Sequence, residues 1–157
     1  MQLYLVQHGE AVAESVDPTR PLSERGREDI RKLAHLLAEN GIRVGRVLHS
    51  GKRRASDTAA LLIEAVGAGA VVEVMEKGLS PKDSPEYLVD AAETWQNDTL
   101  VVGHEPFMSR FLSRLVLGRE KPTIVDFVPG TLVCLARRPV TGAWFIAWML
   151  APALLRR

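Results

Sequence analysis

The chain has 157 residues, the size of one ordinary domain, so it can bury most of its apolar surface around a single core. Hydrophobic residues make up 46% and charged residues 25%, which excludes a disordered or collagen-like chain. The 20 lysine and arginine residues against 19 aspartate and glutamate residues give a net charge of +1, so no global field would attract nucleic acid or an anionic membrane. We therefore expect one domain, residues 1–157, in which any anion site is local.

The single cysteine and the apolar segments indicate the cellular compartment of the protein. Cys134 has no second cysteine to pair with, which fits a reducing compartment. Residues 3–6 are too short for the apolar region of a secretory signal, and the apolar stretch 143–155 is interrupted by Pro152 and is too short to span a bilayer. These features predict a cytoplasmic protein.

Apolar runs alternate with amphipathic helical patterns through most of the chain. Residues 3–6 predict a buried strand, and a helix capped by Ser23 is expected to follow it and to stop at residues 40–41. Residues 46–49 predict the second strand, after which Ser50 is expected to cap the second helix. The pattern so far is strand, helix, strand, helix.

The second half continues this alternation and then changes. Strands are expected at residues 71–75 and 99–102, each followed by a helix, and Pro106 suits the first turn of the second of these helices. The last two apolar segments, 131–136 and 144–149, flank a turn-rich stretch and predict a hairpin.

This order of elements predicts an α/β fold: a three-layer α/β/α sandwich whose sheet is mostly parallel and ends in a C-terminal hairpin. In such sheets the active site lies beyond the carboxyl ends of the strands. Trp144 and Trp148 lie four residues apart in the last expected strand, so the two-residue period places both on one face, where we expect them to pack in the core.

Three short segments, residues 7–11, 50–55 and 103–106, follow the carboxyl ends of three expected strands. Because such ends meet at one edge of a parallel sheet, these segments would bring His8 and His104 to the same mouth. A single histidine beside a strand is more often structural than catalytic. The conjunction of the three segments therefore carries the inference of a functional site.

Cations crowd the first turn of the second expected helix, at Lys52, Arg53 and Arg54. The positive end of the helix dipole disfavours each of them by roughly 0.3 to 1 kcal/mol, so an anion is expected to compensate. Helix N–H groups bind anions, and a guanidinium binds phosphate oxygens bidentately. A solvated basic turn explains Lys52 and Arg53, whereas Arg54 is the candidate for an inward-facing clamp.

These segments resemble the histidine phosphatase superfamily, with its phosphoglycerate mutase-like fold, whose members share an Arg-His-Gly motif after the first strand. The resemblance is strongest to the SixA-type phosphohistidine phosphatases. The matching stretches are residues 6–11, 20–26, 50–59 and 101–106, in the same order and spacing, so the resemblance covers nearly the whole chain.

The resemblance implies roles for individual residues. His8 would take the phosphoryl group as a nucleophile, and Arg54 and His104 would belong to the phosphate pocket. The residues expected to line the substrate site are Gln7, Gly9, Ser50 and Glu10. Glu10 and Glu105 either hydrogen-bond around the pocket or cap the turns that follow them. Neither a metal nor another cofactor is expected.

The chain departs from the family pattern in two places. Gln7 stands where the family has an arginine, and an amide offers two donors and no charge in place of a charged fork, so greatly reduced activity is a possible consequence. Larger family members use a carboxylic acid after the third strand as the general acid. Asp83 and Glu86 lie in that region, and the sequence does not assign the role to either.

Three functions remain open at this point. The first is a phosphohistidine phosphatase that removes phosphate from a signalling or phosphocarrier protein through a covalent intermediate on His8, because a protonated imidazole leaves well without a dedicated acid. The second is a catalytically weakened or silent module that binds phosphohistidine or phosphate. The third is a small-molecule phosphomonoesterase. None of the three requires nucleic acid or a membrane as a partner.

Overall fold

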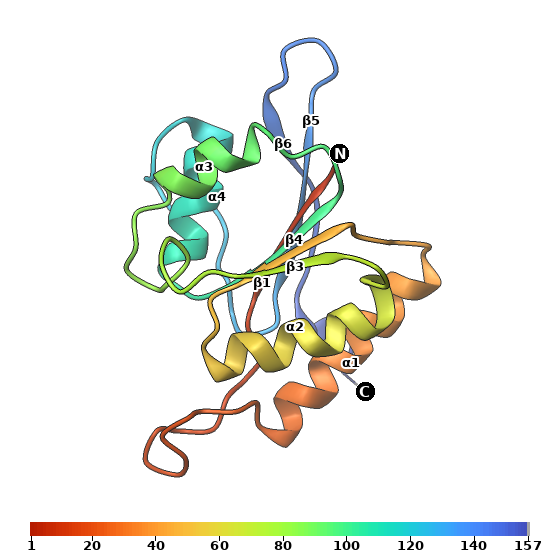
Figure 1. The fold of residues 1–157 in the computed structure, drawn as a ribbon, viewed down its shortest axis with the longest axis vertical. Helices are drawn as coiled ribbons and strands as arrows, with labels where there is room; N and C mark the ends of the chain where they lie inside the picture. Colours follow the sequence, from red (N-terminus) through yellow and green to blue (C-terminus); the bar gives the residue numbers. More distant parts are fainter. Residues whose placement is uncertain (157) are drawn as a thin grey trace.

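The computed structural model describes residues 1–156, in which strands and helices alternate along the chain (Figure 1). Within this range no helix is both long enough and apolar enough for a membrane span. The strands are β1 (Leu3–Gln7), β2 (Arg46–His49), β3 (Val71–Val74), β4 (Thr99–Gly103), β5 (Leu132–Arg137) and β6 (Trp144–Leu150). The helices are α1 (Glu24–Glu39), α2 (Arg53–Val66), α3 (Glu86–Ala92) and α4 (Phe107–Leu117), followed by a short 3-10 turn, η1 (Pro152–Leu154).

The strands form one mixed sheet in the order β3-β2-β4-β1-β5-β6. β1, β2, β3 and β4 are parallel, whereas β5 runs antiparallel to β1 and pairs with β6 as a hairpin. Helices α1 and α2 cover one face of the sheet and α3 and α4 the other (Figure 1). The predicted three-layer α/β/α fold is confirmed.

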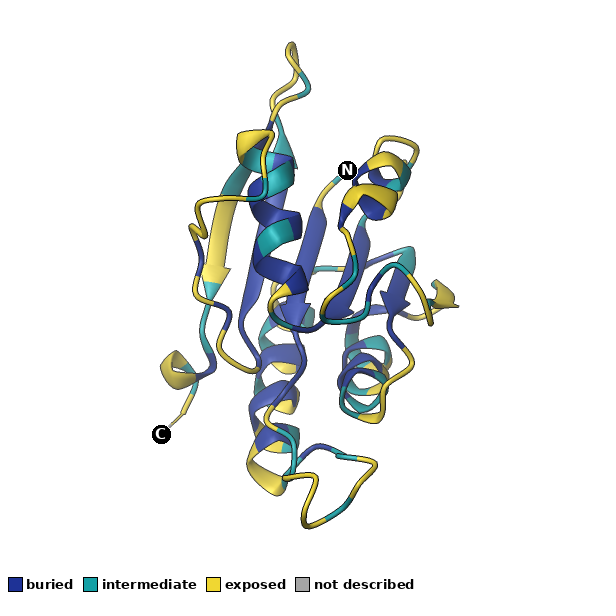
Figure 2. Cartoon of the chain, turned by 90° about the vertical axis from the view of Figure 1, so that its left-hand side faces the viewer, coloured by how far each residue is buried: buried dark blue, intermediate teal, exposed yellow. Residues whose placement is uncertain are grey.

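Side chains of β1 show how both faces of the sheet are buried. Leu3 and Leu5 pack toward Phe111 of α4, whereas Tyr4 and Val6 alternate with them and pack on the α1 and α2 side. β1 is buried at every position, as expected of a strand with a layer of helices on each face (Figure 2).

The start of α1 forms as its sequence predicts. The Ser23 hydroxyl accepts the backbone N–H of Gly26 at 3.0 Å, which satisfies one of the free donors of the first turn. At the other end the chain turns out of the helix through Asn40 and Gly41, and Gly41 has a φ of 72° that favours glycine.

The expected cap of α2 is wrong. The helix begins at Arg53 with Lys52 at the N-cap position, and no side chain caps it there. Ser50 lies too early to cap this helix, and its hydroxyl instead lies 2.6 Å from Nε2 of His104 while accepting the N–H of Lys52 at 3.3 Å. Ser50, which follows β2, therefore contacts His104, which follows the neighbouring strand β4.

The expected common face of the two tryptophans is also wrong. The pairing of β5 with β6 shifts by one residue between Cys134 and Leu135, and such a bulge reverses the side on which the following residues lie. Trp144 is buried on the α4 side, whereas Trp148 is 37% exposed and stacks at a tilt 6.2 Å from Tyr4 on the opposite face.

Candidate active site

The pairing of β1 with β4 brings two histidines together. Gln7, the last residue of β1, pairs with Gly103, the last residue of β4, so His8 and His104 leave the sheet side by side. The backbone N–H of His8 donates to the Gly103 carbonyl at 3.1 Å, and the two imidazole rings lie 5.1 Å apart between centroids. The pairing of Gln7 with Gly103 therefore brings the two strand ends together at one edge of the sheet, as the sequence predicts.

The pairing of β2 with β4 adds Ser50 from the other side. His49 at the end of β2 pairs with Val102, so the next residue, Ser50, lies beside His104. The nitrogen Nδ1 of His49 accepts the N–H of Gly51 at 3.1 Å, which makes His49 part of the turn into α2. Three neighbouring parallel strands, β1, β4 and β2, thus contribute one side chain each.

The geometry of His8 leaves one ring nitrogen for chemistry. Its Nδ1 lies 2.7 Å from the carbonyl oxygen of Gly9, and because a carbonyl can only accept, Nδ1 carries the proton. The pKa of His8 is lowered to about 4, chiefly by burial and also by the charges of Arg54 and Arg20, against the opposing effect of the Gly9 hydrogen bond. At neutral pH the ring is uncharged, and Nε2 has a free lone pair.

His104 is more deeply placed, at 1% exposure. Burial lowers its pKa to about 3, with further contributions from His8 and Arg54. Its Nε2 is engaged by Ser50, while its Nδ1 is buried and has no hydrogen-bond partner within residues 1–156. A neutral imidazole with one uncommitted nitrogen can hydrogen-bond a bound anion.

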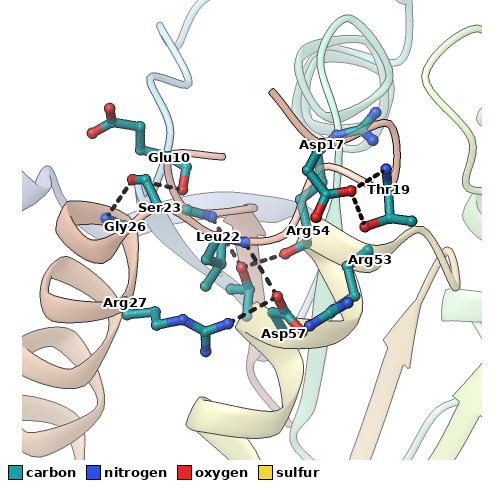
Figure 3. Close-up of polar contacts among 12 residues, drawn as sticks. Glu10, Asp17, Thr19, Leu22, Ser23, Gly26, Arg27, Arg53, Arg54 and Asp57 are labelled. Carbon is teal, nitrogen blue, oxygen red and sulfur yellow. Dashed lines mark hydrogen bonds and ion pairs between the residues drawn. The ribbon is translucent and has the colours of Figure 1, made fainter. Parts of the chain in front are cut away.

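The first turn of α2 supplies the cationic part of the site. The Nε of Arg54 is buried without a partner among the described residues, and burial followed by the charge of Arg20 lowers its pKa. Arg53 instead binds the carboxylate of Asp57 at 3.0 Å and stays outside the site (Figure 3). A desolvated guanidinium beside another cation is stabilised by an anion.

Gln7, the last residue of β1, and Gly9 lie on either side of His8 in the chain. The N–H of Gly9 donates to the hydroxyl of Thr58 at 3.0 Å, and a Cβ at Gly9 would lie 2.9 Å from Ile30, so only glycine lets α1 approach this closely. Gln7 is 5% exposed, and its side-chain oxygen Oε1 is buried without a hydrogen-bond partner in the described part of the chain.

The two glutamates next to the histidines have different surroundings. Glu10 is exposed, its carbonyl accepts the N–H of Ser23 at 2.9 Å, and its carboxylate points away from Arg54 (Figure 3). The Glu105 carboxylate accepts both the N–H of Ser109, at 2.8 Å, and the hydroxyl of Ser109. The Glu105 side chain therefore organises the first turns of α4.

Both carboxylates considered as general acids have other partners. The Oδ2 of Asp83 accepts the backbone N–H groups of Gly78 at 2.7 Å and Ser80 at 3.0 Å, which closes the loop before α3. Glu86 binds Arg114 of α4 at 2.8 Å. Asp83 therefore holds the loop before α3 together, and Glu86 joins α3 to α4.

Arg20 is a member of this neighbourhood that the sequence did not assign. Its charge lowers the pKa of His8, His104 and Arg54 alike, which places it near all three. It lies in the irregular loop between β1 and α1, where no periodicity predicts a side chain's direction. Its position in the family-like stretch 20–26 was the only available signal.

The comparisons with known proteins agree with this geometry. Residues 3–77, which contain His8, Ser50 and Arg54, match the model described as "Histidine phosphatase superfamily (branch 1)". The curated "Phosphohistidine phosphatase SixA" of Escherichia coli (strain K12) is 23% identical over 161 residues, which cover 99% of this chain and 97% of that protein. Over this first part of the chain the sequence is therefore similar to the histidine phosphatase superfamily.

Solved structures show the same fold. The structure of the protein histidine phosphatase SixA complexed with tungstate superposes with a TM-score of 0.83 at 23% identity, covering 99% of this chain and all of that one. The alpha-ribazole phosphatase of Shigella flexneri gives a TM-score of 0.71 at 18% identity and covers 97% of each chain. The resemblance to the histidine phosphatase superfamily that the sequence indicated is confirmed, and the matched family model and the SixA relative support the expected enzyme class, a phosphatase.

Proposed function

We propose that this histidine phosphatase removes phosphate from a phosphohistidine protein through a covalent intermediate on His8. The observation that carries the proposal is the 2.7 Å contact between Nδ1 of His8 and the Gly9 carbonyl. This contact fixes the tautomer and directs the lone pair of Nε2 away from the backbone. A neutral, oriented imidazole is the form that attacks phosphorus.

In the first displacement, Nε2 of His8 forms a bond to phosphorus while the bond from phosphorus to the substrate's imidazole breaks. The electron pair of the broken bond stays on that imidazole, which leaves as a neutral ring if its other nitrogen is protonated. Arg54, the N–H groups at the start of α2 and His104 would stabilise charge on the equatorial oxygens, a role supported by the unpartnered Nε of Arg54 and Nδ1 of His104 among the described residues.

In the second displacement, water attacks the phosphorus of the phosphorylated His8. The bond from Nε2 to phosphorus breaks and its electron pair returns to the ring, while the protons of water remain with the released phosphate. Because Nδ1 keeps its hydrogen bond to Gly9 throughout, His8 returns to its starting tautomer. Neither step needs a metal or a redox partner.

A phosphohistidine substrate suits the site better than a phosphate ester. An alkoxide leaving group needs a general acid, and the two carboxylates suggested by the sequence, Asp83 and Glu86, are bound to loop N–H groups and to Arg114. A protonated imidazole leaves without such an acid. The SixA relative is itself described as a phosphohistidine phosphatase, which supports the same substrate class.

The partner would then be a phosphohistidine-containing signalling or phosphocarrier protein. We also propose a cytoplasmic setting and a single domain over residues 1–157. The buried, free thiol of Cys134 supports a reducing compartment.

The proposal is tested by comparing two substrates under single-turnover conditions. We expect phosphate release from a phosphohistidine protein to be faster by at least about a hundredfold, roughly 2.7 kcal/mol in barrier, than release from an aryl phosphate such as para-nitrophenyl phosphate. Equal rates would point to a general phosphomonoesterase. Saturable binding of the phosphoprotein without release would point to a silent binding module.

A further inference from the structure

We propose that Thr58, in the second turn of α2, is a positioning residue whose hydroxyl sets the direction of the His8 ring and holds the turn that carries Arg54. This inference rests on the proposed function, in which His8 is the nucleophile and Arg54 binds the phosphoryl group. Thr58 itself does not touch the phosphate. It acts through the backbone of Gly9 on one side and the backbone of Arg54 on the other.

The hydroxyl of Thr58 joins Gly9 to a helix that lies 49 residues further along the chain. Its Oγ1 accepts the backbone N–H of Gly9 at 3.0 Å and donates to the backbone carbonyl of Arg54 at 2.8 Å. Because a carbonyl only accepts and an N–H only donates, the single hydroxyl hydrogen points to Arg54 and a lone pair points to Gly9. Both hydrogen bonds therefore have one possible direction, and both depend on the same oxygen.

The peptide group between His8 and Gly9 is held on both of its sides. Its N–H, from Gly9, donates to Thr58, and its carbonyl, from His8, accepts the N–H of Gly130 at 3.1 Å. Because a peptide group is planar, two hydrogen bonds on opposite sides fix its orientation. Glycine has no Cβ to restrict its backbone, so these two bonds help to keep the Gly9 carbonyl at 2.7 Å from Nδ1 of His8.

The first turn of α2 depends on the same oxygen. The helix begins at Lys52 without a side-chain cap, and the Nε of Arg54 is buried without a hydrogen-bond partner among the described residues. The place of the Arg54 guanidinium is therefore set by the backbone from which it extends. The hydrogen bond from Thr58 to the Arg54 carbonyl ties that backbone, through Gly9, to the segment that follows β1.

A polar residue stands out on the buried face of α2. Thr58 is the one polar residue among the five buried residues of this helix, and the other four are Ala55, Ala59, Leu62 and Val66. Threonine is a weaker helix former than alanine or leucine, and a buried hydroxyl costs free energy unless it is hydrogen-bonded. Thr58 has 0% exposure, and both hydrogen bonds of its hydroxyl go to residues of the candidate site. The contacts with Gly9 and Arg54, rather than the packing of α2, therefore explain a hydroxyl at this position.

The test compares Thr58→Val, which keeps the shape of the side chain and removes the hydroxyl, with Thr58→Ser, which keeps the hydroxyl. Heteronuclear NMR of nitrogen-labelled imidazole groups reports the tautomer of His8, and His8→Gln identifies its signals. We expect the wild type and Thr58→Ser to hold the proton on Nδ1, and Thr58→Val to show a second population with the proton on Nε2. A loss of stability alone would not move this signal.

Two further measurements separate the His8 side from the Arg54 side. In Thr58→Val, kcat for free phosphohistidine should fall about tenfold or more, because the buried N–H of Gly9 loses its acceptor. The sulfate Kd, which calorimetry measures without turnover, should rise about threefold or more as the Arg54 turn loosens. Thr58→Ser should stay within about threefold of the wild type in both measurements.

Thr99→Val is the matched control. Thr99 is also a fully buried threonine, and its hydroxyl donates to the Asn97 carbonyl at 2.9 Å at the start of β4, the end of this strand opposite to the site. Thr99→Val should lower stability to a similar degree. It should leave the His8 tautomer unchanged, and kcat and the sulfate Kd should stay within about twofold of the wild type.

Each outcome has a separate meaning. If Thr58→Val loses stability but keeps the His8 tautomer and kcat of the wild type, the hydroxyl only stabilises α2 and the proposal is overturned. An unchanged sulfate affinity in a variant whose tautomer has shifted would overturn the link to Arg54. If Thr58→Val does not fold, Thr58→Ala takes its place in the comparison with Thr58→Ser. If the tautomer and the sulfate affinity respond as expected but no phosphoenzyme forms on His8, the proposed function fails and the positioning by Thr58 stands.

Discussion

The hydroxyl oxygen of Ser50 lies 2.6 Å from Nε2 of His104. Both residues are buried, at 4% and 1% exposure, and they follow the paired ends of β2 and β4. The contact fixes the plane of the His104 ring and leaves its Nδ1 as the nitrogen available to a ligand. The ring that is proposed to bind phosphate is therefore positioned from the neighbouring strand.

Ser50→Ala should lower kcat/KM about tenfold, since removing one hydrogen bond that positions a catalytic group costs about 1 to 1.5 kcal/mol. Steady-state kinetics on a phosphohistidine protein would measure the loss. Ser113→Ala is the matched control, because Ser113 is also buried and donates to the Pro122 carbonyl at 2.8 Å in α4, away from the site. Equal activity losses in the two variants would show a general effect on stability.

The depressed histidine pKa values predict how stability depends on pH. His8 and His104 have an ordinary pKa of 6.5 that burial lowers to about 4 and about 3 in the folded protein. The unfolded chain then binds more protons between these values, so stability is fully present above pH 6.5 and falls as the pH is lowered toward 4. Denaturant unfolding across this window should show a weaker dependence in His8→Gln, and an unchanged slope would contradict the burial of a neutral ring.

Asp57 connects three parts of the chain next to the site. Its carboxylate accepts the N–H of Leu22 and pairs with Arg27 of α1 and Arg53 of α2 (Figure 3). Asp57→Ala should lower the free energy of unfolding by about 1 to 2 kcal/mol, mainly through the unsatisfied Leu22 N–H, because solvent screens both ion pairs at the partly exposed Arg27 and the exposed Arg53. It should also weaken sulfate binding at the site, because Leu22 ties the loop that follows His8 to α2. Asp90→Ala on the exposed side of α3 should change neither quantity.

Gln7→Arg tests the departure from the family pattern. Because a guanidinium adds charge-assisted donors at the phosphoryl oxygens, kcat/KM should rise tenfold to a thousandfold, about 1.4 to 4 kcal/mol, if the buried site accommodates the larger side chain. The Oε1 of Gln7 has no hydrogen-bond partner among the described residues, so the substitution breaks no hydrogen bond at this oxygen. A folded variant with unchanged or lower efficiency would mean that the pocket is adapted to the amide.

The sequence predicts those site residues whose positions are determined by the pairing of parallel strands. Short apolar runs located β1, β2 and β4, and the common edge of a parallel sheet then brings His8, Ser50 and His104 together. The amphipathic pattern of the second helix likewise located the turn that contains Arg54. The four expected pairs of strand and helix, followed by the expected hairpin, predicted the fold class correctly.

The other features of the site and fold depend on tertiary contacts, which the spacing of apolar residues along the chain does not reveal. Ser50 was expected to cap α2 because serine favours that position, and its partner on β4 becomes visible only from the register. A one-residue bulge in the last hairpin placed Trp148 on the face opposite to Trp144. Arg20 lies in an irregular loop, where the direction of a side chain depends on tertiary hydrogen bonds such as the one to Val12.

The proposed mechanism requires that Nε2 of His8 accepts the phosphoryl group. Mixing the protein with a labelled phosphohistidine protein and quenching at intervals should trap an acid-labile, base-stable phosphoenzyme, with the label mapping to the peptide that contains His8. The label should be absent from His8→Ala, which should remain cooperatively folded, and Gly9 and Nδ1 should direct phosphorylation to Nε2 alone. A label that persists in His8→Ala, or that maps to His104, would show that another residue is the nucleophile.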